Sequence, residues 1–186
     1  MIRLATWRDI DKIELLYREI LSHEAKNGSF SNWVMDVYPT RQTAIDGFED
    51  GNLYVYEENG EILGSIILNH IQPDVYGKID WKYSSDNKED FLVIHTLSVS
   101  PRAAGKGLGR KLVEFAFLKA EEMGCISVRL DTFAENIPAA TLYRNSGFRY
   151  AGTAFSVLNG VIPEMQIFFE KEIISIKAKR PLAAVS

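Results

Sequence analysis

The stretch that most restricts the fold lies at residues 97–112 and reads LSVSPRAAGKGLGRKL. An apolar, strand-like run over 91–99 stops at a proline, three glycines follow at alternate positions, and helical periodicity continues over 108–123. A further strand-like run comes at 126–131. A strand, a helix and a second strand in this order form a right-handed crossover unit, in which the two strands lie parallel. The sequence therefore predicts a parallel strand pair at the centre of the chain.

The flanking segments provide antiparallel partners for that pair. Asn59-Gly60 and Asn159-Gly160 each separate two strand-like runs, which is typical of hairpin turns. The remaining strands are expected at 2–5, 53–56, 62–69, 149–157 and 164–172, and the remaining helices at 8–23, 40–48 and 139–145. We therefore predict a mixed α/β (α+β) fold, with a single domain over 1–174 and a polar C-terminal tail over 175–186.

Composition excludes several classes of function. The chain has 186 residues, 46% of them hydrophobic, and a formal net charge of −4, so no general affinity for nucleic acid or anionic membranes is expected. Its single cysteine, Cys125, cannot form an intramolecular disulfide or a cysteine-rich metal site. The chain begins without a signal-peptide pattern and holds no apolar run long enough to span a bilayer. We expect a cytoplasmic protein with no bound metal.

The glycines between strand and helix suit a phosphate ligand. The first amide N–H groups of a helix have no partner within the helix and carry partial positive charge. Gly105, Gly107 and Gly109 would let a phosphate reach those groups, because glycine has no side chain and adopts backbone angles that other residues resist. The neighbouring cations are Lys106, Arg110 and Lys111. A flexible turn without a ligand is the alternative interpretation.

The spacing fits neither common nucleotide fingerprint. Lys106 is followed by Gly107 instead of Ser or Thr, and Arg110 stands where a dinucleotide-binding motif has its third glycine. Asp131 ends the next strand about 20 residues on, where a ribose-binding acid would lie. The remainder of the chain is too short for a doubly wound sheet, so a dinucleotide-dependent oxidoreductase is retained only as an alternative.

Two motifs together resemble the GNAT family of acetyl-coenzyme-A-dependent N-acetyltransferases. The first is Val-x-Pro followed by a glycine-rich helix start, here VSPRAAGKGLG at 99–109. The second is Asn-x-x-Ala-x-x-Leu-Tyr and then Gly-Phe, here at 136–143 and 147–148. Ala104 departs from the pattern, because the family usually has Arg or Gln there, and we expect an altered affinity for the cofactor. The resemblance implies a mostly antiparallel sheet of about seven strands with helices on both faces and a splayed parallel pair at the cofactor site.

The resemblance also implies a set of residues that bind acetyl-coenzyme A. Leu97 and Val99 present main-chain groups to the pantetheine arm, and residues 104–109 hold the pyrophosphate. Asn136 contacts the cofactor where the parallel strands diverge. The full set of implied cofactor-binding residues is Leu97, Ser98, Val99, Ala104, Gly105, Lys106, Gly107, Leu108, Gly109, Arg110, Asn136, Ala139 and Tyr143.

Acetyl transfer to an amine needs a base for the amine proton and an acid for the departing thiolate. The resemblance places Tyr143 near the sulfur as the acid, and core packing is its alternative role. His95 is the candidate base, since its ordinary pKa of about 6.5 suits neutral pH. Strict alternation along the strand puts His95 on the same face as Leu97 and Val99. Water as the base, with His95 only hydrogen-bonded, is equally open.

The acceptor is the part that the sequence describes least. A small-molecule or peptide amine is expected, and an aromatic pocket would suit an ammonium group. The candidate substrate-contacting residues are Trp33, Tyr38, Trp81, Tyr83 and Phe168. A catalytically weak acyl-coenzyme-A sensor or scaffold of the same fold is a second functional class. A homodimer through exposed aromatics or the last strand is compatible with the sequence.

Overall fold

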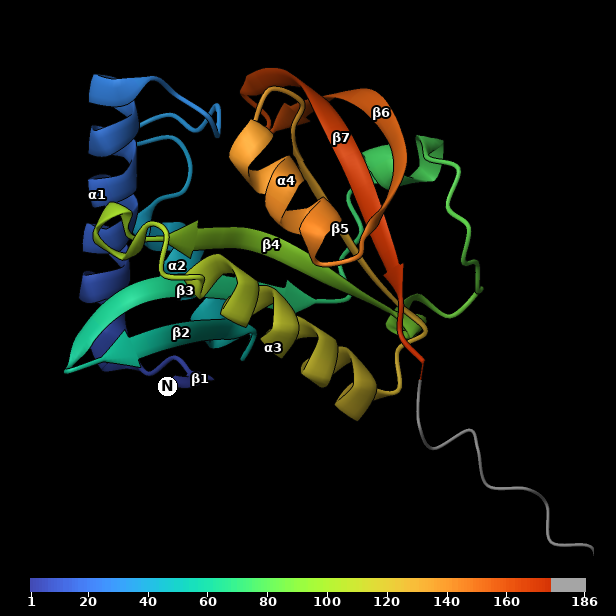
Figure 1. The fold of residues 1–186 in the computed structure, drawn as a ribbon, viewed down its shortest axis with the longest axis horizontal. Helices are drawn as coiled ribbons and strands as arrows, with labels where there is room; N and C mark the ends of the chain where they lie inside the picture. The colour runs from blue at the N-terminus through green and yellow to red at the C-terminus, as the bar shows by residue number, and fades with distance from the viewer. Residues whose placement is uncertain (175–186) are drawn as a thin grey trace, which may run out of the picture.

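A seven-stranded sheet in the order β1-β2-β3-β4-β5-β7-β6 runs through the protein (Figure 1). The computed structural model describes residues 1–174, and the predicted tail at 175–186 lies outside the described residues. The strands are β1 (Ile2–Leu4), β2 (Leu53–Glu58), β3 (Glu61–Asn69), β4 (Phe91–Val99), β5 (Ser127–Phe133), β6 (Arg149–Leu158) and β7 (Ile162–Glu172). The α-helices are α1 (Ile10–Asn27), α2 (Arg41–Glu49), α3 (Leu108–Met123) and α4 (Ile137–Asn145).

The parallel pair predicted from the crossover is β4 and β5, and every other pair of neighbours is antiparallel. Pairing between β4 and β5 begins at Phe91↔Ser127 and ends at Ile94↔Leu130. Beyond that point β5 continues alongside β7 to Phe133↔Gln166, while β4 stays beside β3. The two strands therefore splay apart, and the predicted fold class is confirmed.

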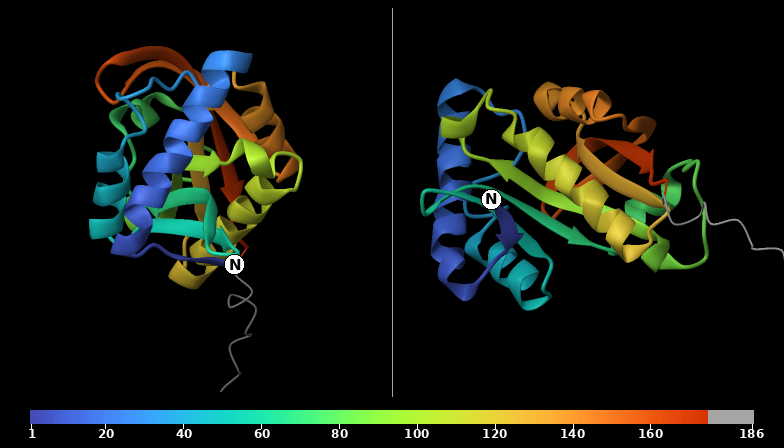
Figure 2. Two further views of the ribbon diagram at one scale, coloured as in Figure 1. Left: turned by 90° about the vertical axis from the view of Figure 1, so that its left-hand side faces the viewer. Right: turned by 60° about the horizontal axis from the view of Figure 1, so that its bottom comes forward.

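The helices cover both faces of the sheet (Figures 1 and 2). On one face, α1 and α2 pack on β2 and β3 through a cluster that includes Ile13, Leu53 and Val55. On the other face, α3 and α4 pack on β3, β4 and β5 through a cluster that includes Leu112 and Tyr143. No helix within residues 1–174 is both long and apolar enough to cross a bilayer.

A β-bulge in β4 changes which face its side chains reach. Ser65 pairs with Ser98, but Ile67 pairs with His95, so β4 has one extra residue opposite Ile66. Thr96 lies at the bulge with a φ of 45°. The extra residue shifts the alternation by one position, so His95 lies on the α1–α2 face of the sheet, whereas Leu97 and Val99 pack against the α3–α4 cluster. The expectation that these three side chains share a face is therefore wrong.

Candidate active site

A pocket of about 450 Å³ opens where β4 and β5 diverge. Its walls come from α1 and the segment after it, the loop after β3, the ends of β4 and β5, the segment that leads into α4, α4 itself and the β6–β7 hairpin. Three hydrogen bonds tie the segment after α1 to the rest of the pocket. They join the Tyr38 hydroxyl to Thr96 Oγ1 at 2.5 Å, Asn159 Nδ2 to the Val37 carbonyl at 3.1 Å, and Asn32 Nδ2 to Glu164 Oε2 at 2.9 Å.

The start of α3 fits a phosphate ligand. The first helical hydrogen bond runs from the Lys111 N–H to the Gly107 carbonyl, so the N–H groups of residues 108–110 precede it, and no side chain caps the helix at Gly107. Gly105 and Gly107 have φ values of 73° and 72°, in the left-handed region, and a Cβ on either would meet open space. The diphosphate of acetyl-coenzyme A could therefore approach the main chain here without obstruction.

Gly109 has a different role from the other two glycines. A Cβ on Gly109 would lie 3.1 Å from Leu142 Cδ2, so this glycine permits close packing of α3 against α4. Among the predicted cations, Arg110 pairs with Glu114 at 2.8 Å, and the Lys111 ammonium lies over the Tyr56 ring at 5.6 Å. Lys106 forms no ion pair within the described part of the chain and is exposed. The loop thus offers amides and at least one unengaged cation.

The structure brings the implied cofactor residues of β4 and α4 together in the pocket, whereas those at 104–110 lie outside its lining. Leu97, Ser98, Val99 and Ala139 all line it. Asn136 lines it as well, and its Oδ1 accepts a hydrogen bond from the Ala139 N–H at 3.1 Å, which caps the start of α4. The exposed Ala104 lies in the turn that precedes α3 and does not line the pocket. Main-chain groups at the end of β4 face the gap left by β5, as an extended ligand arm requires.

Tyr143 lies in α4 with its ring against Phe148 and Phe169, at centroid distances of 5.8 and 5.9 Å. The residue is only 6% exposed, yet it lines the pocket, and its hydroxyl has no hydrogen-bond partner among residues 1–174. Burial and the nearby Asp131 carboxylate raise the pKa of Tyr143 well above its ordinary value. The phenol therefore stays protonated at neutral pH and can donate a proton.

His95 is half-buried at the same pocket. Its Nε2 lies 3.0 Å from Asn69 Oδ1 and 3.1 Å from the Ile71 carbonyl oxygen, and both are acceptors. Asn69 Oδ1 also accepts from the Ile71 N–H, which fixes the orientation of that amide. The neutral ring must therefore carry its proton on Nε2, leaving Nδ1 as the acceptor. Burial lowers the pKa of His95 to about 4, so the ring is neutral and weakly basic.

Three carboxylates line the pocket, those of Glu24, Asp131 and Glu164, and none is in the set of candidate site residues predicted from the sequence, although Asp131 was considered as a ribose-binding acid. Asp131 at the end of β5 accepts a hydrogen bond from the Tyr76 hydroxyl at 2.8 Å. Burial, together with the negative charge of Glu164, raises the pKa of Asp131 to about 6, although the Tyr76 hydrogen bond opposes this. Glu164 on β7 is 5% exposed and accepts from Asn32 and Gln166. A charged residue within a strand-like run was the available signal, but only the fold shows that both side chains reach one pocket.

The predicted aromatic residues divide into two groups. Trp33 and Tyr38 line the pocket, and their rings meet edge to face at 5.9 Å. Phe168 on β7 is fully buried, and the Trp81 ring packs against it at a centroid distance of 6.2 Å. The Arg129 guanidinium lies 4.3 Å from the centre of the Trp81 ring. The Tyr83 hydroxyl donates to Glu172 at 3.1 Å, away from the pocket. Trp81, Tyr83 and Phe168 therefore do not share the site with the other two.

Comparisons with known proteins identify the family of this chain. A family model described as "Acetyltransferase (GNAT) family" matches residues 15–148. The N-acetyltransferase YesJ of Bacillus subtilis (strain 168) is 27% identical over 67% of this chain and 63% of its own length. A streptothricin acetyltransferase from Escherichia coli is 29% identical over 74% of this chain and 71% of its own length. The chain thus spans slightly less than two thirds of YesJ.

Solved structures show the same architecture. The crystal structure of an acetyltransferase of the GNAT family from Streptococcus agalactiae 2603 superposes with a TM-score of 0.72 and 25% identity, covering 92% of this chain and 94% of that one.

Proposed function

This chain belongs to the acetyltransferase (GNAT) family, and on that premise we propose that it transfers the acetyl group of acetyl-coenzyme A to a primary amine. The amine attacks directly while both substrates are bound. One observation carries the proposal: a single pocket joins the end of β4, where β5 has diverged, to the Tyr143 phenol and the carboxylates of Glu24, Asp131 and Glu164. The predicted family and enzyme class agree with the comparisons.

Acetyl-coenzyme A supplies a thioester carbonyl for attack. The amides at the start of α3, with Gly105 and Gly107, would hold its diphosphate, and the main chain of β4 at Leu97 and Val99 would hold its pantetheine arm. Thr96 and Leu97 have no register partner on β3, and β5 has diverged by that point. We place the donor for the oxyanion that forms on the carbonyl among the main-chain N–H groups at this bulge.

The reaction forms one bond between the amine nitrogen and the carbonyl carbon and breaks one carbon–sulfur bond. The amine proton must pass to a base, and the departing thiolate must gain a proton. We assign the second transfer to Tyr143, whose raised pKa keeps its proton available. We assign the first to Asp131, because a pKa of about 6 combines an ionised state at pH 7 with greater basicity than His95 has at about 4.

This assignment moves the role of base from His95 to Asp131, with Tyr76 holding the carboxylate in place. His95, which donates from Nε2 to Asn69 and Ile71, then serves to shape the wall of the pocket. Proton acceptance by His95 Nδ1 is the competing assignment. The two assignments predict different pH–kcat/KM profiles for Tyr76→Phe and His95→Gln, because only the variant that perturbs the base shifts the acid limb.

Binding and turnover test the proposal in sequence. Acetyl-coenzyme A and coenzyme A should raise the thermal midpoint of the protein, whereas NAD should leave it unchanged. Thiol release should then appear with at least one member of a panel of amines. Binding without turnover on any amine would identify a sensor or scaffold, and stabilisation by NAD alone would favour an oxidoreductase.

A tyrosine variant sharpens the test. Tyr143→Phe should lower kcat by about 100-fold, as loss of a general acid does, while the thermal shift with coenzyme A stays the same. The matched control is Tyr150→Phe, because Tyr150 lies exposed on β6 with its hydroxyl on Thr153 at 2.7 Å. An undiminished kcat in Tyr143→Phe would remove this residue from the mechanism.

A further inference from the structure

Three carboxylate side chains in the described chain are almost completely buried: Asp9 at 3% exposure, Glu164 at 5% and Glu170 at 0%. Asp9 forms an ion pair with Arg3, and Glu170 forms one with Arg149. Glu164 differs, because both of its partners are neutral amides: Asn32 Nδ2 at 2.9 Å and Gln166 Nε2 at 2.8 Å. A buried charge without a counter-ion is costly, so Glu164 is the one buried acid here whose cation the fold does not provide.

The residues around Glu164 add further negative charge and no cation. Glu24, Asp131 and Glu164 all line the pocket, and no lysine or arginine of residues 1–174 lines it. Glu24 accepts only from neutral groups, among them the Ser31 hydroxyl at 2.6 Å. Tyr143, only 6% exposed, also lines this pocket, and its hydroxyl has no hydrogen-bond partner among residues 1–174. The pocket therefore holds an unpartnered phenol together with three carboxylates that no lysine or arginine lining it balances within residues 1–174.

The position of Glu164 is fixed by segments far apart in the sequence. Gln166 lies two residues along the same strand, and Asn32 reaches it from the segment after α1. Trp33, the next residue, lines the pocket with Tyr38, and aromatic faces attract cations. A carboxylate held between two amide groups loses little freedom when a ligand binds, and it can bind an ammonium group of the acceptor directly.

We propose that the acceptor is a dicationic amine, such as an α,ω-diaminoalkane. One amino group loses its first proton to solvent and attacks the thioester beside Tyr143; its second proton passes to Asp131 as the carbon–sulfur bond breaks and Tyr143 protonates the thiolate. The other amino group stays an ammonium ion and binds to Glu164. This inference rests on the proposed acetyltransferase function and specifies its substrate class. Binding of the second ammonium would supply the missing counter-ion of Glu164 and select diamines over monoamines of equal length.

The test compares matched acceptors at pH 7.5 with acetyl-coenzyme A: 1,5-diaminopentane against pentylamine and 5-amino-1-pentanol. We expect kcat/KM for the diamine to exceed that for either monoamine by about tenfold or more, as a charged hydrogen bond allows. Glu164→Gln should remove most of that preference, and the diamine-to-pentylamine ratio is the readout because loss of the Glu164 charge also acts on Asp131, which serves both acceptors. Glu164→Asp, which keeps the charge, should retain part of it. Equal values for diamine and monoamine in the wild-type protein would overturn the proposal.

A matched control and a binding measurement complete the experiment. Glu172→Gln removes one exposed carboxylate from the same strand outside the pocket, and it should leave the preference unchanged.

Calorimetric titration of 1,5-diaminopentane into the coenzyme-A-loaded protein measures binding without turnover. If no amine is acetylated, the proposed function fails, and loss of diamine binding in Glu164→Gln still supports the cation site. Equal diamine binding by both proteins would refute it. Should Glu164→Gln fail to fold, the wild-type ratio of kcat/KM for the diamine to that for the monoamines decides whether the proposal stands.

Discussion

Asp9 and Asp131 are both held by the fold, yet their surroundings shift the two pKa values in opposite directions. Asp9 accepts hydrogen bonds from Arg3 Nη1 and Nη2, at 2.7 and 2.9 Å, and from the Thr6 N–H at 2.7 Å. Its pKa falls to about 2, chiefly because of the Arg3 hydrogen bonds. Asp131 has one neutral donor, Tyr76, and burial raises its pKa to about 6. One carboxylate is stabilised as an ion, and the other is left ready to take a proton.

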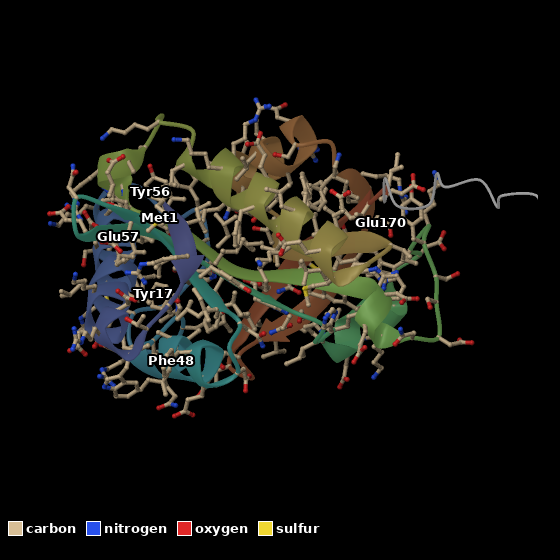
Figure 3. All side chains as sticks on the ribbon, turned by 90° about the horizontal axis from the view of Figure 1, so that it is seen from below. Met1, Tyr17, Phe48, Tyr56, Glu57 and Glu170 are labelled. Carbon is tan, nitrogen blue, oxygen red and sulfur yellow. The ribbon has the colours of Figure 1, made fainter. Side chains whose placement is uncertain are left out.

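Glutamates show the same contrast. Glu57 and Glu170 lie toward opposite ends of the molecule (Figure 3), and each contacts an arginine, Arg3 and Arg149 respectively. Glu164 at the pocket contacts only amides. Asp9, Glu57 and Glu170 therefore each lie beside an arginine, whereas Asp131 and Glu164 have no lysine or arginine partner among residues 1–174. Such local conflicts between burial and pairing are expected at functional sites.

The largest expected effect comes from removing the unpaired aspartate. Asp131→Asn should lower kcat/KM by about 100-fold at pH 7.5, because an amide cannot accept the amine proton. Its midpoint in urea should not fall, since the charge that burial disfavours has gone. Steady-state kinetics and urea unfolding measure the two effects. Wild-type turnover in this variant would return the base to His95 Nδ1 or to water.

Removing the paired aspartate should have the opposite outcome. Asp9→Asn leaves Arg3 without its main partner, so the free energy of unfolding should drop by about 2 kcal/mol. Activity should stay near wild type, because Asp9 lies outside the pocket. Urea denaturation, followed by circular dichroism, gives the first quantity. A variant that loses activity but keeps its stability would contradict the division of roles drawn here.

The pH dependence of stability should also differ in sign between the two aspartates. Asp9 has a lowered pKa, so its contribution is complete above about pH 4 and is lost as the pH falls toward 2. Asp131 has a raised pKa, so the folded state gains stability from it as the pH falls from about 6 to about 4. The free energy of unfolding of Asp131→Asn should thus exceed that of wild type by more at pH 7 than at pH 4. Parallel stability curves for the two proteins would show that Asp131 is not perturbed.

The smallest effect is expected from the residue that positions Asp131. Tyr76→Phe removes a hydrogen bond that lowers the pKa of Asp131, so the acid limb of the pH–kcat/KM profile should move upward by about one unit or less. His95→Gln, which keeps a side-chain N–H donor, should leave that limb in place. A limb that moves in His95→Gln instead would identify the histidine as the titrating group.

Much of the cofactor side could be predicted because its signals are local. The glycines at 105 and 107, the crossover around them and the Asn136-to-Tyr143 spacing each lie within a short stretch, where backbone angles and helix starts depend on neighbouring residues. Even there, packing decided one role, because Gly109 contacts Leu142 on another helix. The assignment of 1–174 as one domain stays a prediction.

The acceptor side could not be predicted in the same way. Trp33 and Tyr38 reach the pocket but Trp81 and Phe168 do not, and nothing in their sequence neighbourhoods separates the two pairs. The bulge at Thr96 reversed the expected direction of His95 relative to Leu97, since one inserted residue shifts the two-residue period of a strand.

By itself the sequence determined the family, the order of strands and helices, and the glycine-rich loop that precedes α3. It did so because these features arise from contacts between residues close along the chain. The tertiary structure alone decided which charges meet. Asp131, Glu164 and Glu24 come from three distant segments, and the absence of a lysine or arginine from their pocket, within residues 1–174, follows from which side chains the folded chain places around them.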